Sequence, residues 1–434
     1  DFDQTLSGTG RVQLWLGSST GLQSLPHWTS DGAQAAEGFG SSAASAGDVN
    51  GDGYSDIIVG APGYNGGQAQ EGRAALYLGA ADGLTANADW TAQGLQFGAA
   101  FGSSVASAGD VNGDGYSDVI MGAPTFSNGQ TNEGRITAYH GGLTGLVHPP
   151  ETIVESNQPG AQLGLSVATA GDVNGDGYSD VVVGASRFDN GQLDEGRVFL
   201  YYGGGAGLFI GGWAVESNQA GAEFGSVGRA GDVNGDGYGD FIVGSYLFDN
   251  GQTDEGRTFV YHGGPGALST AAAWTAESDQ AVAHFGGSVS TAGDVNGDGF
   301  SDVIVGAARF DNGQTDEGRA FVYYGGPAGL SPTPAWTAES NQIDAGFGNS
   351  VTSAGDVNGD GYSDVIVGAP KFDNGQNDEG RAFVYHGGPA GLSPTPAWTA
   401  ESDQADAEFG ISVASAGDVN GDGYSDVIVG APKF

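Results

Sequence analysis

Short apolar runs separated by polar, glycine-rich segments recur along the whole chain. Residues 347–402 show the pattern once. Within them, residues 348–354 form a run of small side chains, and residues 364–368 form a continuous apolar run, as expected of a strand buried on both faces. Residues 381–386 alternate between polar and apolar, and residues 396–401 begin with a proline that a strand tolerates at its first position. The pattern predicts four short strands joined by turns.

This pattern belongs to a repeat with a period of about 62 residues. The string Asp-Val-Asn-Gly-Asp-Gly occurs seven times, with successive spacings of 62, 62, 60, 62, 62 and 62 residues. A second marker falls once in each unit, at Trp28, Trp90, Thr152, Trp213, Trp274, Trp336 and Trp398. The chain is therefore one array of seven units rather than several ordinary domains.

Four strands in 62 residues leave no room for a helix of ordinary length, so we expect an all-β protein. Radial packing of four-stranded antiparallel sheets gives a β-propeller, here with seven blades in a single domain that covers residues 1–434. The approximate blade bounds are 30–91, 92–153, 154–214, 215–275, 276–337, 338–399, and 400–434 together with 1–29.

The two ends of the chain indicate a closed ring. The chain ends at Lys433-Phe434, which matches Lys371-Phe372 just after the second strand of a unit, and residues 10–16 match residues 380–386 of a third strand. The C-terminus would supply strands one and two of the last blade, and the N-terminus strands three and four. A linear solenoid would leave these two half-units far apart. Because the chain starts at Asp1, without Met or a signal peptide, we expect a mature or trimmed piece.

Composition and charge exclude several classes of protein. The chain has 12 Lys and Arg residues against 53 Asp and Glu, a net charge of −41, which would repel the phosphate backbone of nucleic acids. It has 0 cysteines, so disulfides, iron–sulfur clusters and thiolate zinc sites are excluded. No apolar run approaches the roughly 20 residues of a membrane helix, so we expect no membrane insertion.

The acidic loop between strands one and two is a candidate metal site. It reads Asp-x-Asn-Gly-Asp-Gly-x-x-Asp in all seven units, with oxygen side chains at positions 1, 3, 5 and 9 and a main-chain carbonyl available at position 7. Alternating oxygens around a tight turn suit Ca²⁺, and the absence of thiol or imidazole disfavours zinc and copper. We therefore predict up to seven Ca²⁺ ions, one in each blade. The predicted ligands are Asp48, Asn50, Asp52, Tyr54, Asp56, Asp110, Asn112, Asp114, Tyr116, Asp118, Asp172, Asn174, Asp176, Tyr178, Asp180, Asp232, Asn234, Asp236, Tyr238, Asp240, Asp294, Asn296, Asp298, Phe300, Asp302, Asp356, Asn358, Asp360, Tyr362, Asp364, Asp418, Asn420, Asp422, Tyr424 and Asp426.

Two other interpretations fit this loop less well than a calcium site. An EF-hand would need Glu at position 12 and flanking helices, whereas position 12 is apolar, as at Val367, and the flanks are strand-like. An Asx-rich turn without metal would leave three carboxylates within nine residues, and their mutual repulsion would go uncompensated.

Two further motifs bring a family resemblance. Phe-Gly precedes the first strand at Phe39, Phe101, Phe224, Phe285, Phe347 and Phe409, and Gly-Ala-Pro follows the second strand at Gly60, Gly122, Gly368 and Gly430. With the acidic loop, the chain resembles the FG-GAP repeats of integrin α-subunits and their bacterial relatives. The resemblance implies a seven-bladed propeller with Ca²⁺ between strands one and two, on the face opposite the ligand-binding one.

The units also depart from the integrin pattern. The third unit has Leu163-Gly164 and Gly184-Ala185-Ser186, the fourth has Gly244-Ser245, and the fifth has Gly306-Ala307-Ala308. Integrin propellers resembling this chain keep calcium loops in only some blades and have divergent blades, whereas all seven loops are present here. The uniformity indicates a bacterial repeat protein, a recent duplication or a designed consensus, and a monomer rather than an integrin-type heterodimer.

The remaining repeated residues allow more than one interpretation. Polar loops such as residues 248–257 and 401–404 read either as a multivalent surface for sugars or a basic partner, or as solvated turns. An arginine at one position in every unit (Arg11, Arg73, Arg135, Arg197, Arg257, Arg319 and Arg381) indicates an ion pair more than a ligand contact. The strand-four Trp indicates packing at the outer edge or between blades more than sugar stacking.

Catalysis has no support in the sequence. No nucleophile elbow, phosphate loop or HExxH motif occurs, and His140, His262 and His386 share a repeat position with Tyr202 and Tyr324. We expect a non-enzymatic, secreted, extracellular or cell-surface module for adhesion or ligand binding, with an unknown protein or glycan ligand on the face opposite the calcium loops. The alternatives are a structural or designed scaffold, and a non-catalytic propeller of a secreted hydrolase or lyase.

Overall fold

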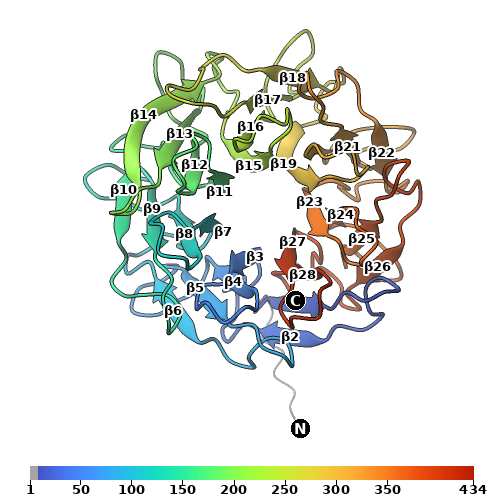
Figure 1. The fold of residues 1–434 in the computed structure, drawn as a ribbon, viewed down its shortest axis with the longest axis horizontal. Coiled ribbons are helices and arrows are strands. Elements are labelled where there is room, and N and C mark those ends of the chain that lie inside the picture. The colour runs from blue at the N-terminus through green and yellow to red at the C-terminus, as the bar shows by residue number, and fades with distance from the viewer. Residues whose placement is uncertain (1–7) are drawn as a thin grey trace.

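Seven four-stranded antiparallel sheets stand around a central channel (Figure 1). The computed structural model describes residues 8–434, and all the regular elements in that range are β-strands. The innermost strand of each sheet lies at the channel and the outermost strand at the rim, so each sheet is one blade of a propeller. The predicted fold class is confirmed. Over the same range there is no helix long and apolar enough to cross a membrane.

The strands follow one another in the same order in every blade. The first three complete blades contain β3 (Ser42–Gly47), β4 (Asp56–Ala61), β5 (Arg73–Tyr77) and β6 (Trp90–Gln93); β7 (Ser104–Gly109), β8 (Asp118–Ala123), β9 (Arg135–Tyr139) and β10 (Thr152–Glu155); and β11 (Ser166–Gly171), β12 (Asp180–Ala185), β13 (Arg197–Tyr202) and β14 (Phe209–Glu216). The next three contain β15 (Ser226–Gly231), β16 (Asp240–Ser245), β17 (Arg257–Tyr261) and β18 (Trp274–Glu277); β19 (Phe285–Gly293), β20 (Asp302–Ala307), β21 (Arg319–Tyr323) and β22 (Trp336–Glu339); and β23 (Ser350–Gly355), β24 (Asp364–Ala369), β25 (Arg381–Tyr385) and β26 (Trp398–Glu401).

The last blade joins the two ends of the chain, as predicted. It is built from β27 (Ser412–Gly417) and β28 (Asp426–Ala431) at the C-terminus and from β1 (Arg11–Trp15) and β2 (Trp28–Asp31) at the N-terminus, in the order β2-β1-β28-β27. Strand β1 pairs with β28 antiparallel from Arg11↔Ala431 to Trp15↔Val427. A main-chain ladder therefore closes the ring, and no sheet is left half built.

Pairing within a blade separates the loops onto two faces. In the β23–β26 blade, Ser350 is paired with Gly368 and Gly355 with Asp364, so the acidic loop lies at one end of the hairpin and the loop after β24 at the other. We call these two ends the acidic-loop face and the polar-loop face. The second strand is buried at all six positions in every blade, which accounts for its continuous apolar sequence.

The hydrophobic core lies between the blades. One cluster joins Ile304 and Val322 of one blade to Val365 and Val367 of the next. At the outer end of this cluster, the Trp336 indole donates its Nε1–H to the carbonyl of Ser393, 3.0 Å away, in the turn of the next blade. Its ring meets Tyr385 edge to face at 4.8 Å. The repeated tryptophan packs between blades, which confirms one of its two predicted structural roles.

Replacing Trp336 by Phe should lower the free energy of unfolding by about 1 kcal/mol more than the loss of ring area alone, because the Ser393 carbonyl loses its donor. Trp90 is the matched control, since its ring also meets a tyrosine, Tyr139, at 4.7 Å, but its Nε1 has no partner among the described residues. Chemical denaturation of the two Trp→Phe variants in the same calcium buffer measures the difference. Equal losses would contradict the role given to this bond.

Candidate functional site

Each acidic loop is a turn closed by its own side chains. In the loop that starts at Asp356, the two carboxylate oxygens of that residue accept the N–H groups of Gly359 at 2.7 Å and Gly361 at 2.8 Å. Asn358 Oδ1 accepts the N–H of Asp360 at 2.9 Å. The same bonds recur in the other six loops, for example at Asp48 and Asp418. The oxygen side chains at positions 1, 3 and 5 are therefore gathered around one turn.

The aspartate at position 9 has a structural role as well. Asp364 is fully buried, and its two oxygens accept the N–H groups of Val357 at 2.9 Å and Gly387 at 2.8 Å. The pKa of Asp364 is raised to about 7, mainly by burial and to a smaller extent by the negative charges of Asp360 and Asp356, against the lowering effect of the two N–H bonds. The pKa values of Asp56, Asp180, Asp240, Asp302 and Asp426 rise to about 7 and that of Asp118 to about 6, with burial as the main cause.

The donor set of each loop fits a hard cation. Positions 1, 3, 5 and 9 all offer side-chain oxygens. At position 1, Asp356 Oδ2 accepts one N–H and keeps a second lone pair, whereas Oδ1 accepts two N–H groups. As the side chains stand, however, residues 8–434 contain no group of three or more His, Cys, Asp or Glu side chains close enough to hold a metal ion. The structure thus folds the predicted residues at positions 1, 3 and 5 of each loop into one turn, while a calcium site that also includes position 9 stays a prediction.

Neighbouring acidic loops are bonded to one another around the ring. The N–H of Ser425 donates to the carbonyl of Asp356, 2.9 Å away, across the boundary between two blades. The Tyr424 ring lies over Gly359, where an added Cβ would come within 2.5 Å of Tyr424 Cε1 and where φ is +71°. Only glycine fits at this position. The shape of one loop therefore depends on the next loop along the ring.

On the polar-loop face, the repeated arginines form ion pairs, as predicted. Arg381 lies 2.6 Å from Glu401 of strand β26, and its guanidinium stacks over Phe372 with the centroid 4.7 Å away. All seven arginines are half-buried and paired with a carboxylate: Arg11–Asp31, Arg73–Glu37, Arg135–Glu155, Arg197–Glu216, Arg257–Glu277, Arg319–Glu339 and Arg381–Glu401. Six of these pairs join strand three to strand four of one blade, whereas Arg73 pairs with Glu37, which lies before β3.

The polar loops contain buried residues that sequence reasoning missed. Glu195 is 1% exposed and accepts the N–H of Asn190 at 2.6 Å, so it fixes the loop from inside. The equivalent glutamates Glu71, Glu133, Glu255, Glu317 and Glu379 are also buried. The available signal was a glutamate before Gly-Arg in six of the seven units.

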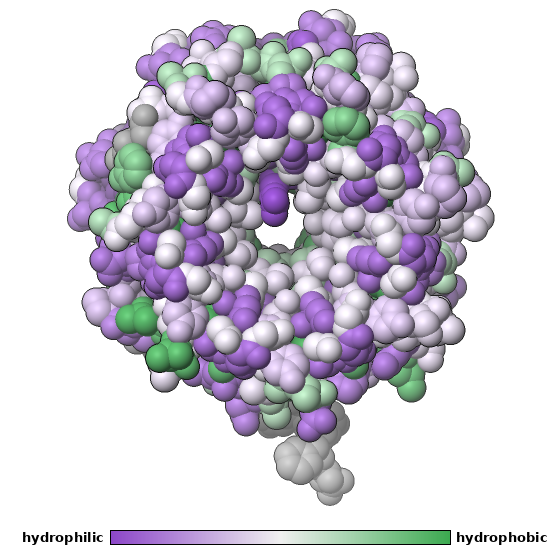
Figure 2. Space-filling model, viewed as in Figure 1, coloured by the Kyte–Doolittle hydropathy of each residue, from purple (hydrophilic) through white to green (hydrophobic). Residues whose placement is uncertain are grey.

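Amide side chains fasten the polar loops to one another. Gln342 Nε2 donates to the carbonyl of Asp373 at 2.8 Å, and Gln342 Oε1 accepts the N–H of the same residue at 2.6 Å. Gln158, Gln219 and Gln280 each make the same pair of hydrogen bonds. Much of the repeated amide chemistry is therefore used inside the protein, which favours the interpretation of these loops as turns. Figure 2 shows hydrophilic side chains spread over the blades around the open channel.

The histidines do not gather into a catalytic arrangement. His262 and His386 lie against Gly329 and Gly21 in the turn of the following blade, where an added Cβ would be 3.3 Å and 3.1 Å from the histidine ring. Tyr324 takes the same place against Gly391. Burial lowers the pKa of His262 and His386. Their exchange with tyrosine is explained by packing.

Comparison with known proteins identifies the repeat. The FG-GAP repeat matches residues 39–77, 101–139, 163–201, 224–261, 285–323, 347–385 and 409–434. The chain is 33% identical to integrin alpha-4 of Xenopus laevis over 214 residues, 48% of this chain and 20% of that protein. It is 37% identical to integrin alpha-IIb of Mus musculus over 161 residues, 35% of this chain and 15% of that protein.

A third relative is the phosphatidylinositol-glycan-specific phospholipase D of Homo sapiens, 28% identical over 364 residues, 74% of this chain and 42% of that protein. The chain thus spans a fifth or less of the two integrins and under half of the phospholipase. Because the repeat matches in all seven blades and over more than half of its length, this chain belongs to the FG-GAP repeat family.

Proposed function

We propose that this chain is a calcium-stabilised propeller that acts as an extracellular module for adhesion or ligand binding. The observation that carries the proposal is the acidic loop, which is folded alike in all seven blades and bonded to its neighbours around the ring. Similarity to integrin α-subunits supports a protein or glycan ligand on the polar-loop face. Calcium loops of extracellular modules bind at roughly 10⁻⁴–10⁻³ M, which suits calcium concentrations outside cells.

Calcium would hold the ring shut by binding the folded state alone. Asp356, Asn358, Asp360 and Asp364, with the carbonyl of Tyr362, would supply the oxygens in one loop. A ligand present at about 100 times its Kd stabilises the folded state by about 2.7 kcal/mol per site. Each loop also donates to or accepts from the next loop, so an ion in one blade would order two neighbours.

A second candidate is a non-catalytic propeller domain of a larger secreted hydrolase. The observation in its favour is the similarity to the phospholipase over 74% of this chain, more than either integrin match covers. A structural scaffold without a ligand is the third possibility. Protein and glycan arrays under saturating calcium separate these functions, since specific hits support the binding module and silence supports the scaffold. For all three functions we propose one monomeric propeller domain over residues 1–434.

Removing divalent cations with excess chelator should lower the melting temperature by many degrees, because up to seven binding energies are lost from the folded state only. Differential scanning calorimetry with and without calcium measures the shift. Restoring calcium should restore the melting temperature, and magnesium at the same concentration is the control for ionic strength. A melting curve that does not respond to the chelator would overturn the calcium assignment.

Asp360→Asn should remove one strong calcium site in a titration by calorimetry and reduce the calcium-dependent rise in melting temperature. In chelator the same variant should melt at or above the parent, because it removes one of three mutually repelling carboxylates. Asp403→Asn is the matched control, since it makes the same charge change at an exposed position outside the acidic loops. If both variants respond alike, the loop is not a calcium site.

A further inference from the structure

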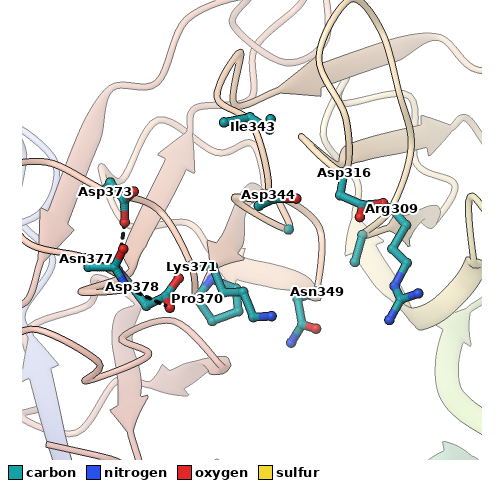
Figure 3. Close-up of a pocket in the computed structure, with 12 residues that line it drawn as sticks. Arg309, Asp316, Ile343, Asp344, Asn349, Pro370, Lys371, Asp373, Asn377 and Asp378 are labelled. Atoms are coloured by element: carbon teal, nitrogen blue, oxygen red, sulfur yellow. Dashed lines mark hydrogen bonds between the residues drawn. The ribbon is translucent and has the colours of Figure 1, made fainter.

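A polar groove lies on the polar-loop face between the β19–β22 blade and the β23–β26 blade (Figure 3). Its volume is about 570 Å³, within the range of sites that take small ligands. Arg309 follows β20 and Lys371 follows β24, so adjacent blades each contribute one cation to the lining. Figure 3 shows Asn349 drawn between these two side chains.

The two cations of this groove lack the partners that their equivalents have in other blades. Arg187 occupies the repeat position of Arg309 and is paired with Glu223 at 3.1 Å. Lys433 occupies the repeat position of Lys371 and is paired with Glu408 at 2.7 Å. In the part of the chain that the structure describes, neither groove cation forms an ion pair.

A single residue accounts for both missing ion pairs. Glu223 and Glu408 stand directly before the Phe-Gly motif of their units, and Gly346 holds that position in the groove. A carboxylate at position 346 would face Arg309 across the blade boundary, as Glu223 faces Arg187. It would also face Lys371 within its own blade, as Glu408 faces Lys433. Gly346 therefore leaves both groove cations without the glutamate that pairs with Arg187 and with Lys433 in other units, in a chain that has 12 basic residues and 53 acidic ones.

The lining indicates what kind of anion would fit. A guanidinium and an ammonium favour a carboxylate, which accepts charge-assisted bonds from both. The other polar side chains are Asn349, Asn377 and four aspartates, which can exchange hydrogen bonds with hydroxyl groups. Ile343, 58% exposed, is the single large apolar side chain among the twelve lining residues, and none of them is aromatic. This chemistry favours a hydroxylated ligand over an acidic peptide with apolar side chains.

The overall charge limits the charge density of that ligand. A net charge of −41 repels polyanions over long range, and the four aspartates of the groove add to the repulsion nearby. A densely sulfated chain would meet this repulsion at every sugar. A ligand with one carboxylate for each sugar is attracted by Arg309 and Lys371 and is repelled less by the negative charge of the protein.

We propose that this groove binds a uronic-acid oligosaccharide, with the sugar carboxylate held by Arg309 and Lys371 and the hydroxyl groups by the surrounding amides and aspartates. The inference rests on the proposed role of the chain as a ligand-binding module and names one site and one ligand class for it. The equivalent cations elsewhere, Arg187 and Lys433, are neutralised within the protein and do not form such a site.

Gly346→Glu is the decisive variant, because it places in the groove the residue that sibling blades have at the same position. Gly346 has φ of +64°, and Glu223 and Glu408 adopt φ of +47° and +53° there. An added Cβ at Gly346 would meet nothing closer than the Ala308 carbonyl, at 3.9 Å. The variant is therefore expected to fold, and its melting temperature in calcium verifies this. Its new carboxylate is expected to neutralise Arg309 and Lys371.

The probes are trigalacturonate, its methyl ester and hexaglutamate, titrated by calorimetry into the full chain at one fixed calcium concentration. We expect trigalacturonate to bind the parent and its methyl ester to bind at least 10-fold more weakly. Gly346→Glu and Lys371→Ala should each lower the affinity for trigalacturonate at least 10-fold. Lys433→Ala, which removes a cation that is already paired, should leave the affinity unchanged.

Several outcomes would overturn the proposal. They are absence of trigalacturonate binding, equal affinity for the acid and its ester, equal affinity of the parent and Gly346→Glu, or binding of hexaglutamate alone. If trigalacturonate fails while calcium still raises the melting temperature and the arrays report another ligand, only the groove assignment falls. If calcium has no effect and the arrays are silent, the proposed function falls with it.

Discussion

The contact between neighbouring blades is the constraint on which the whole structure depends. Beside the channel, the N–H of Val413 donates to Ser350 Oγ at 3.2 Å, and in the acidic loops the N–H of Ser425 donates to the carbonyl of Asp356. In the polar loops, Gln342 Nε2 donates to the carbonyl of Asp373. At the rim, the Trp336 indole donates to the carbonyl of Ser393. Because the ring is closed, each blade packs against a neighbouring blade on both of its sides. A contact residue that every unit repeats therefore acts at seven boundaries at once.

The sequence predicted the parts of the fold that follow from local patterns. The apolar run at residues 364–368 became β24 (Asp364–Ala369), because a strand covered on both faces has no polar alternation. The pairing of β1 with β28 followed from matching two half-units. The first strand was predicted from residue 348 but begins at Ser350, since Phe347 is a buried anchor and Gly348 turns the chain with φ of +87° before the ladder starts.

The remaining features depend on contacts that a local pattern does not contain. Glu195 stands in a polar loop and reads as solvated, yet the folded loop closes over it and supplies its N–H donor. The bond from Gln342 to Asp373 spans 31 residues and joins two different polar loops, one after β22 and one after β24 of the next blade. Asp364 was identified by its spacing as a candidate ligand, but its two bonds to buried N–H groups show that the same carboxylate also fastens the loop to the β25 end.

Near-identity of the blades makes each departure from the repeat informative. A residue shared by seven units, such as Arg381, is explained by the packing of one blade and implies nothing about a ligand. Gly346 has the opposite status: packing does not require it, because Glu occupies the same backbone conformation in two other blades. Its effect is electrostatic, since it removes the carboxylate that would neutralise two cations of a groove. A ring whose stability rests on repeated contacts elsewhere can accept such a local change, so specificity is free to develop in a single groove while the scaffold stays uniform.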